Sequence, residues 1–153
     1  MRKLIRGSLF IIIPGIFIYL GSCAPGSCFE ETECYLKASF YKSTVLSTPD
    51  SLTLYGLDRD SIIYSSKTGV QPALIPLNAS TESSKFVIII NGVTDTIEFR
   101  YSSYPHLISK ECGYTFYHHL DTIPPFTKHI IKVIYLSNPT ITNLNVENIR
   151  IFY

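Results

Sequence analysis

The chain has 153 residues, with 13 basic and 12 acidic side chains and a formal net charge of +1. This length allows one domain with a sizeable core after removal of a leader, and it is too small for two comfortable domains. Three basic residues lie in the first six positions, so the rest of the chain carries ten basic against twelve acidic side chains. This balance argues against a nucleic-acid partner, because such binding depends on neutralising phosphates.

The N-terminus predicts a helical secretory signal peptide. A cationic start at residues 2–6 precedes an apolar run over residues 9–20, and Leu-Gly-Ser comes directly before Cys23. This order is typical of a signal peptide, and the apolar run is too short for a comfortable membrane span. The triplet before Cys23 resembles a bacterial lipobox, which implies removal of residues 1–22 and diacylation of the Cys23 thiol. The two alternatives are a signal peptide without lipidation and an uncleaved anchor through residues 4–20.

The cysteines after Cys23 predict a disulfide. Cys28, Cys34 and Cys112 are an odd number for an exported protein, so one disulfide and one spare thiol is the simplest outcome. We favour a bridge from Cys28 to Cys112, with Cys34 as an alternative partner of Cys112. Such a long closed loop contributes about 3–5 kcal/mol in the chain-entropy model. A local Cys28–Cys34 bridge would close a smaller loop and contribute less.

Short stretches with alternating apolar and polar residues follow residue 34 and are separated by turn residues, a pattern typical of half-buried strands. We expect a tether over residues 23–34 and an all-β domain over residues 35–153. The domain is expected to be an antiparallel, immunoglobulin-like β-sandwich of about eight or nine short strands. The expected strands are Tyr35–Tyr41, Ser51–Leu57, Ser61–Tyr64, Ala73–Leu77, a hairpin over Phe86–Tyr101, Glu111–Leu120, His129–Leu136 and Asn148–Tyr153.

The dipeptide Asn91-Gly92 between two β-rich runs is the strongest short hairpin signal in the chain. A two-residue turn there puts Asp95 opposite Ile88 on the apolar face, which is costly if the carboxylate is buried. A four-residue loop over residues 91–94 instead pairs Ile88 with Ile97 and leaves Asp95 at the edge of the loop. Both registers keep the same face inward, and we prefer the second.

The chain shows no pattern that predicts catalysis or metal binding. His118 and His119 are adjacent in an expected strand, so their rings point to opposite faces and cannot share one ion. There is no Gly-x-Ser-x-Gly elbow, no glycine-rich phosphate loop and no recognisable pair of catalytic carboxylates. We therefore expect a protein that is not an enzyme and that needs no metal or cofactor.

An aromatic cluster offers an alternative, ligand-binding function. Tyr101, Tyr104 and His106 are expected to lie together in an exposed loop, where aromatic rings contact a glycan or another small ligand. Two facts weigh against this interpretation. The chain has no Trp, the commonest stacking residue for pyranose rings, and tyrosines often fill the cores and rims of sandwiches with their hydroxyls kept wet.

Four of the five Asp residues begin an Asp-Ser/Thr-Leu/Ile triplet. This triplet resembles the O-glycosylation motif of exported proteins in Bacteroidota-type bacteria. The same residues also suit Asx and ST turns that precede a strand, which is the alternative explanation. The candidate acceptor hydroxyls belong to Ser51, Ser61, Thr96 and Thr122.

Several short motifs carry a wider resemblance over residues 28–153. They are Cys28-Phe-Glu-Glu-Thr-Glu33, Leu36-Lys-Ala-Ser-Phe-Tyr41, Asp50-Ser-Leu-Thr-Leu-Tyr-Gly56, Leu74-Ile-Pro-Leu-Asn78, Asp95-Thr-Ile-Glu-Phe-Arg-Tyr101 and Glu111-Cys-Gly-Tyr114. On these motifs the chain resembles a family of small, functionally uncharacterised lipoproteins from Bacteroidota-type bacteria. The family pattern has cysteines at the positions of Cys28 and Cys112, which implies that these two pair. The resemblance implies no activity, ligand or catalytic residue.

Together these patterns predict a non-enzymatic lipoprotein of the cell envelope. Its acyl chains hold it to a membrane, and it acts through a protein partner as an accessory or structural subunit. Ala24, and not Asp, follows the lipidated cysteine, and this resembles the signal that sorts lipoproteins to the outer membrane. Whether the domain then faces the periplasm or the outside is left open by the sequence.

Overall fold

The structure is a computed structural model that describes residues 26–57 and 62–153. The expected signal peptide over residues 1–22, Cys23 and Ser61 lie outside the described residues. Within the described ranges the regular secondary structure consists of eleven strands, β1 to β11. No helix in those ranges is long and apolar enough to cross a bilayer.

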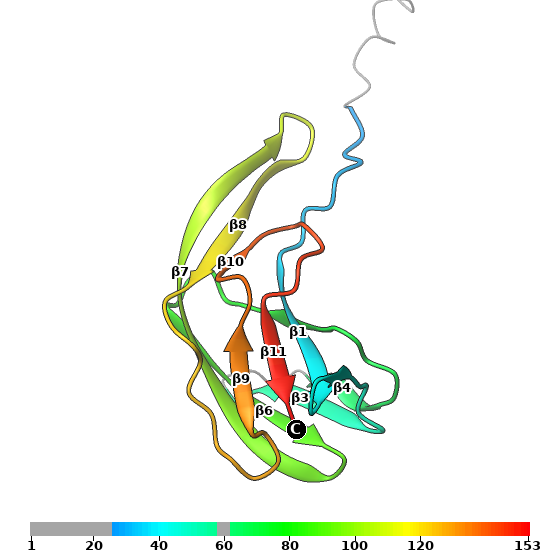
Figure 1. The fold of residues 1–153 in the computed structure, drawn as a ribbon. Coiled ribbons are helices and arrows are strands. Elements are labelled where there is room, and N and C mark those ends of the chain that lie inside the picture. Colours follow the sequence, from blue (N-terminus) through cyan, green and yellow to red (C-terminus); the bar gives the residue numbers. More distant parts are fainter. Residues whose placement is uncertain (1–25, 58–61) are drawn as a thin grey trace, which may run out of the picture.

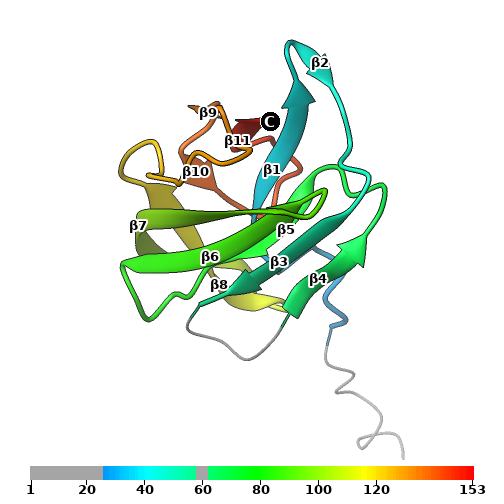
Figure 2. The same cartoon turned by 90° about the horizontal axis from the view of Figure 1, so that it is seen from below.

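Two packed sheets form the domain, which confirms the expected all-β sandwich (Figures 1 and 2). The larger sheet has six strands in the order β10-β8-β7-β6-β3-β4, and all neighbouring pairs in it are antiparallel. Its strands are β3 (Leu52–Gly56), β4 (Ile62–Lys67), β6 (Ser83–Ile90), β7 (Val93–Ser109), β8 (Gly113–Leu120) and β10 (Thr140–Ile141).

The smaller sheet has five strands and joins the two ends of the domain. The strands nearest the two ends of the chain, β1 and β11, are neighbours in this sheet and run parallel, with Ala38 opposite Ile149. The other pairs in the sheet are antiparallel. Ala38 also pairs with Ala73 and Tyr41 with Leu46, so two short strands share the other edge of the first strand. The strands are β1 (Tyr35–Lys42), β2 (Val45–Leu46), β5 (Ala73–Pro76), β9 (Val133–Leu136) and β11 (Ile149–Phe152).

Alternation along the strands builds one hydrophobic core between the sheets. β3 shows this most clearly, because Leu52 and Leu54 are fully buried while Thr53 between them is not. The same inward face of the larger sheet continues through Phe86, Ile88 and Ile90. From the smaller sheet the core receives Leu36, Ala38, Phe40, Ala73, Ile75, Ile134, Ile149 and Ile151.

The β6–β7 hairpin uses the register that we did not prefer. Ile90 pairs with Val93 across a two-residue turn at Asn91-Gly92, and Ile88 faces Asp95. Asn91 and Gly92 both have positive φ, 51° and 84°, which is the conformation that such a tight hairpin turn requires. The expected four-residue loop is therefore wrong, and Asp95 is buried instead of lying at a loop edge.

β7 also differs from expectation, because it continues as one strand of 17 residues through the segment expected to be a loop. Its first half pairs with β6 and its second half with β8. The β7–β8 pair continues past its last pairing with β10, which is at His118; residues 104–117, here called the hairpin arm, extend towards the end where the N-terminal segment leaves the domain (Figure 1). The C-terminus lies near the opposite end of the molecule.

Candidate functional site

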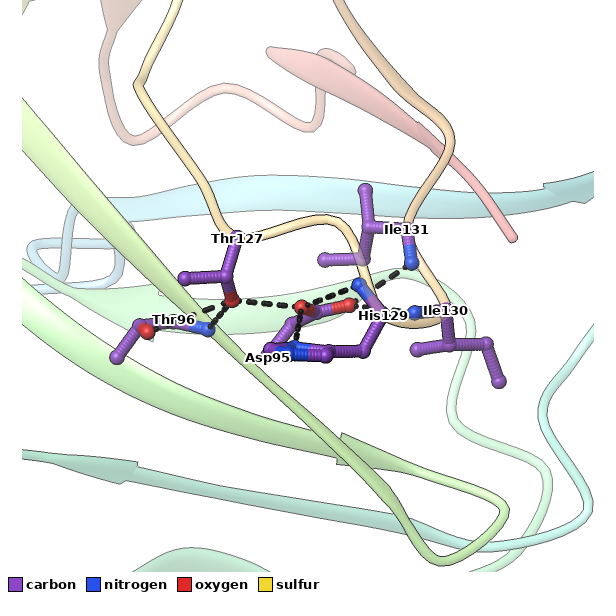
Figure 3. Close-up of polar contacts among 6 residues, drawn as sticks. All are labelled: Asp95, Thr96, Thr127, His129, Ile130 and Ile131. Atoms are coloured by element: carbon purple, nitrogen blue, oxygen red, sulfur yellow. Dashed lines mark hydrogen bonds and ion pairs between the residues drawn. The ribbon is translucent and has the colours of Figure 1, made fainter.

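Asp95 is a charged residue inside the core and marks the first of two candidate sites. It is the third residue of β7 and only 1% exposed, because the two-residue turn directs its side chain to the inner face of the sheet. A carboxylate in that position is stable only if hydrogen bonds replace its lost water. The segment over residues 127–131, which lies across the start of β7, supplies them (Figure 3).

Both carboxylate oxygens of Asp95 are used. Oδ1 accepts from the Thr127 hydroxyl at 2.6 Å and from the backbone N–H of His129 at 2.9 Å. The ring atom Nδ1 of His129 also lies 2.9 Å from Oδ1. Oδ2 accepts from the backbone N–H groups of Ile130 and Ile131, at 2.8 and 2.9 Å.

These contacts determine the charge state of Asp95. Burial by itself raises the pKa of the carboxyl, but the hydrogen bonds from Ile131, Thr127, His129 and Ile130 outweigh it and lower the pKa from 3.8 to about 2. The carboxylate is thus ionised and its oxygens are already engaged by the protein. We interpret the cluster as a clamp that fixes the 127–131 segment to β7, since a general base would need an oxygen free for substrate.

The sequence contained only a weak signal for this clamp. Asp95 stands on the apolar face of a two-residue hairpin, so one of the two registers implied a buried carboxylate that needs partners. Its partners are mostly backbone N–H groups, which carry no sequence signature. The Thr127 hydroxyl oxygen also accepts a hydrogen bond from the backbone N–H of Thr96 at 2.8 Å, which extends the contact along β7.

The second candidate site is the junction between the N-terminal tether and the tip of the hairpin arm. Cys28 and Cys112 form a disulfide, with their Cα atoms 4.8 Å apart and a sequence separation of 84 residues. The expected pairing is confirmed, and among the cysteines that the structure describes Cys34 is the free one. Gly26 packs so closely on the tip that a Cβ at this position would lie 2.7 Å from Cγ of Glu111.

Further contacts hold the tether along the arm. The Thr115 hydroxyl donates to the carbonyl of Thr32 at 2.7 Å, and the Cys34 thiol lies 3.8 Å from the same hydroxyl oxygen. Burial raises the pKa of the Cys34 thiol, so this cysteine is held in its unreactive form. The Asn143 amide links the same region, because it donates to the carbonyl of Glu31 and accepts from the Tyr117 hydroxyl.

The three residues of the expected ligand loop do not form one surface. Tyr101 is only 1% exposed; its hydroxyl accepts from the backbone N–H of Asn78 and donates to the Asn78 carbonyl, both at 3.0 Å. Tyr104 and His106 point to the opposite face of β7, where they flank Tyr117, and His106 stacks on that ring at 4.2 Å. The loop expectation is therefore wrong, because the segment is a strand and its alternation separates Tyr101 from the other two.

The adjacent histidines point to opposite faces, as expected. His118 is buried, and its Nδ1 lies 2.8 Å from the Ser103 hydroxyl oxygen, while His119 is exposed. Burial lowers the pKa of His118, which keeps the ring neutral. In the part of the chain that the structure describes, no three His, Cys, Asp or Glu side chains are grouped closely enough to hold a metal ion.

The candidate glycosylation triplets differ in accessibility. Asp95, which begins the triplet of Thr96, is buried in the clamp, and Thr96 itself is half-buried. Ser51 is also half-buried, and the next residue of its triplet lies in the core. Thr122 is exposed together with both other residues of its triplet, Asp121 and Ile123.

The fold and the disulfide place this chain in a structural class, and its sequence places it in a protein family. The class is an all-β sandwich whose N-terminal segment is bonded by a disulfide to a projecting hairpin. The chain belongs to a family of unknown function (DUF6452), whose model matches residues 51–153. The match begins after β1 and Cys28, so it is shorter than the resemblance expected over residues 28–153. No curated protein and no solved structure matches the chain.

Proposed function

We propose that this protein is a non-enzymatic lipoprotein of the bacterial cell envelope that acts through protein contacts as an accessory or structural subunit. In this proposal Cys23 carries the acyl chains, and the domain is held at the outer membrane. The wider assignment of the family to lipoproteins of Bacteroidota-type bacteria is part of the same proposal.

The disulfide between Cys28 and Cys112 is the observation that carries this proposal. Disulfides of this kind persist in oxidising compartments, which supports export by the leader. The bridge also lies only five residues after Cys23, so it would join the lipid anchor directly to the folded domain. A disulfide at this place keeps residues 28–34 fixed to the hairpin arm when the tether is pulled.

The polar clusters within the described ranges favour a structural role over a catalytic one. The Asp95 carboxylate is occupied by the 127–131 segment, and the buried His118 is neutral and contacts Ser103. The Ser103 hydroxyl beside the neutral His118 ring has the chemistry of a nucleophile and base, but the ring is only 3% exposed and so is closed to a substrate. Acyl or glycosyl transfer requires groups that a substrate can reach, and the oxygens of Asp95 are already occupied.

The glycan-binding alternative loses one of its aromatic rings, since Tyr101 lies in the core. Tyr104 and His106 remain on one face of the arm beside Tyr117 and are the residues to test. A Tyr104→Ala and His106→Ala double variant that lost binding on a glycan array would favour this alternative over protein contacts.

Metabolic labelling with a tagged fatty acid tests the anchor. We expect the wild-type chain to be labelled and membrane-bound, and the Cys23→Ala variant to be unlabelled and released. An unlabelled wild-type chain that fractionates with membranes to the same extent as Cys23→Ala would contradict the proposal. Cross-linking in intact cells, followed by purification, should then recover a defined envelope protein; recovery of the chain alone would contradict the accessory role.

A further inference from the structure

The hairpin arm carries an exposed apolar face at the end of the molecule where the described chain begins, at Gly26. Register places Pro105 opposite Phe116 and Leu107 opposite Tyr114, and residues directly opposite share one face of a hairpin. Leu107 is 47% exposed, Phe116 46% and Tyr114 73%, and Pro105 is also exposed. We call these four residues the arm face.

The arm face is exposed at all four of its residues, and only Phe116, nearest the base of the arm, lies beside residues 32–35 of the tether and the start of β1. On the other side, Thr115 donates to the backbone of Thr32, and Tyr117 donates to Asn143 and stacks with His106. The tether and its neighbours therefore cover part of that side. The arm face continues the inward face of β7 and β8, but it extends past the smaller sheet that would otherwise cover it (Figure 1).

Chain length limits how far the tip of the arm lies from Cys23. Gly26 packs on Glu111 at the tip and stands three residues after Cys23, and three extended residues span at most about 11 Å. The disulfide at Cys28 sets a second limit, since five residues span at most about 18 Å. Tyr114 lies two residues beyond Cys112, which adds about 7 Å along the strand.

We propose that the arm face, together with the neighbouring Phe29, rests in the interfacial layer of the lipid bilayer and acts as a second contact with the membrane. This inference rests on the proposed lipidation of Cys23, which places the start of the tether at that layer. The layer is about 5–8 Å thick on each side of the hydrocarbon core, so a tip tied within about 11 Å of an anchor there can reach the headgroups. A Tyr side chain such as Tyr114 suits this layer, because its ring is apolar and its hydroxyl can hydrogen-bond to water.

The charges around the tip indicate which force drives the contact. The tether carries Glu30, Glu31 and Glu33 and the tip carries Glu111; the basic residues among them are Lys110 at the tip and Lys37 near Glu31, so negative charge is in excess. Attraction to anionic headgroups therefore cannot hold the arm to the bilayer. Burial of the apolar side chains would do so, and we expect the contact to form on zwitterionic phosphatidylcholine and to persist in high salt.

The chain has no Trp, which allows a single-site test. A Tyr114→Trp variant carries the reporter on the arm face, where the exposed ring tolerates replacement. The matched control is Tyr135→Trp, which replaces a 56% exposed Tyr in β9, outside the arm. Each variant is purified from membranes as the lipidated mature protein and reconstituted into vesicles of phosphatidylcholine or of its brominated analogue.

Brominated lipid quenches Trp emission at short range. We expect the emission of Tyr114→Trp to fall by about half or more, as for a ring buried roughly 5–10 Å into the headgroup and acyl boundary. Its emission should also shift to the blue on vesicles, and that of Tyr135→Trp should change little. Equal quenching of the two variants, or quenching of Tyr114→Trp only with anionic lipid and low salt, would overturn the inference.

The outcome separates this inference from the proposed function. The intact mass shows directly whether the acyl chains are present. If they are absent, both the lipid anchor and the arm contact that rests on it are refuted. Lipidated protein on vesicles with an unquenched Tyr114→Trp refutes the arm contact alone. A blue shift that rises with protein concentration and occurs without quenching would instead assign the arm face to a second copy of the chain.

Discussion

Replacing Asp95 by Asn tests the clamp most directly, because the side chain keeps its size and loses its charge. Asn offers one acceptor oxygen and one NH2 group, whereas the native carboxylate accepts on both oxygens. Whichever way the amide turns, its NH2 group faces donors. If it faces the backbone N–H groups of Ile130 and Ile131, both lose their acceptor.

The expected loss of stability follows from these contacts. A buried donor left without a partner costs about 1–3 kcal/mol, so two such donors cost roughly 2–6 kcal/mol. The pKa of Asp95, lowered from 3.8 to about 2, independently gives about 2 kcal/mol for the ionised over the protonated carboxyl. The Asn amide adds a donor facing donors, so we expect Asp95→Asn to lower the free energy of unfolding by about 3–5 kcal/mol.

Urea denaturation of the mature protein at pH 7, followed by circular dichroism, measures this loss. The matched control is Asp121→Asn, because Asp121 begins the same Asp-Thr-Ile triplet but is exposed. We expect the control to change stability by less than about 0.5 kcal/mol. A loss below about 1 kcal/mol for Asp95→Asn, or equal losses for both variants, would refute the assignment of the clamp.

The pH dependence gives a second measurement of the same group. The folded-state pKa of Asp95 lies below its ordinary value, so its contribution is fully present above about pH 4 and is lost as pH falls towards 2. The stability difference between wild type and Asp95→Asn should therefore shrink by about 2 kcal/mol between pH 5 and pH 2. A difference that stays constant across that range would mean that folding does not lower the pKa of the Asp95 carboxyl.

Three further predictions concern the disulfide, the core hydroxyl and the modification site. Cys112→Ser should lower the free energy of unfolding by about 4–5 kcal/mol in the chain-entropy model, measured under non-reducing conditions. Tyr101→Phe should lower it by about 1–2 kcal/mol, because Asn78 loses the hydrogen bonds of the hydroxyl. If the native protein carries O-glycans, Thr122→Ala should lower its intact mass by the mass of a glycan, whereas Thr96→Ala should not. The reason is that all three residues of the Thr122 triplet are exposed, while the Thr96 triplet begins with the buried Asp95.

Each of these has its own control. Cys34→Ser should leave disulfide-dependent stability unchanged, because Cys34 takes no part in the disulfide between Cys28 and Cys112. Tyr104→Phe is the partner of Tyr101→Phe on the exposed face of the same strand and should change stability by less than about 0.5 kcal/mol. An intact mass that shows acyl chains only would exclude glycosylation at Thr122.

The sequence by itself determined the class of fold. Alternation in segments such as Leu52–Gly56 and the turn dipeptide Asn91-Gly92 are local signals, because side chains of a strand point alternately to two faces and positive φ is permitted to few residues. The family pattern of cysteines predicted the pairing of Cys28 with Cys112. Strands of two residues, β2 and β10, were missed because alternation needs more residues to be visible.

Tertiary structure decided what happens to Asp95 and to the arm. Local cost favoured the register that kept the carboxylate out of the core, but backbone N–H groups of a segment over thirty residues away reverse that preference. The segment with Tyr101 and Tyr104 was expected to be an exposed aromatic loop, yet pairing with β8 makes it a strand that buries one ring and exposes the other. Both decisions depend on partners that are distant along the chain, and local sequence patterns carry no information about those partners.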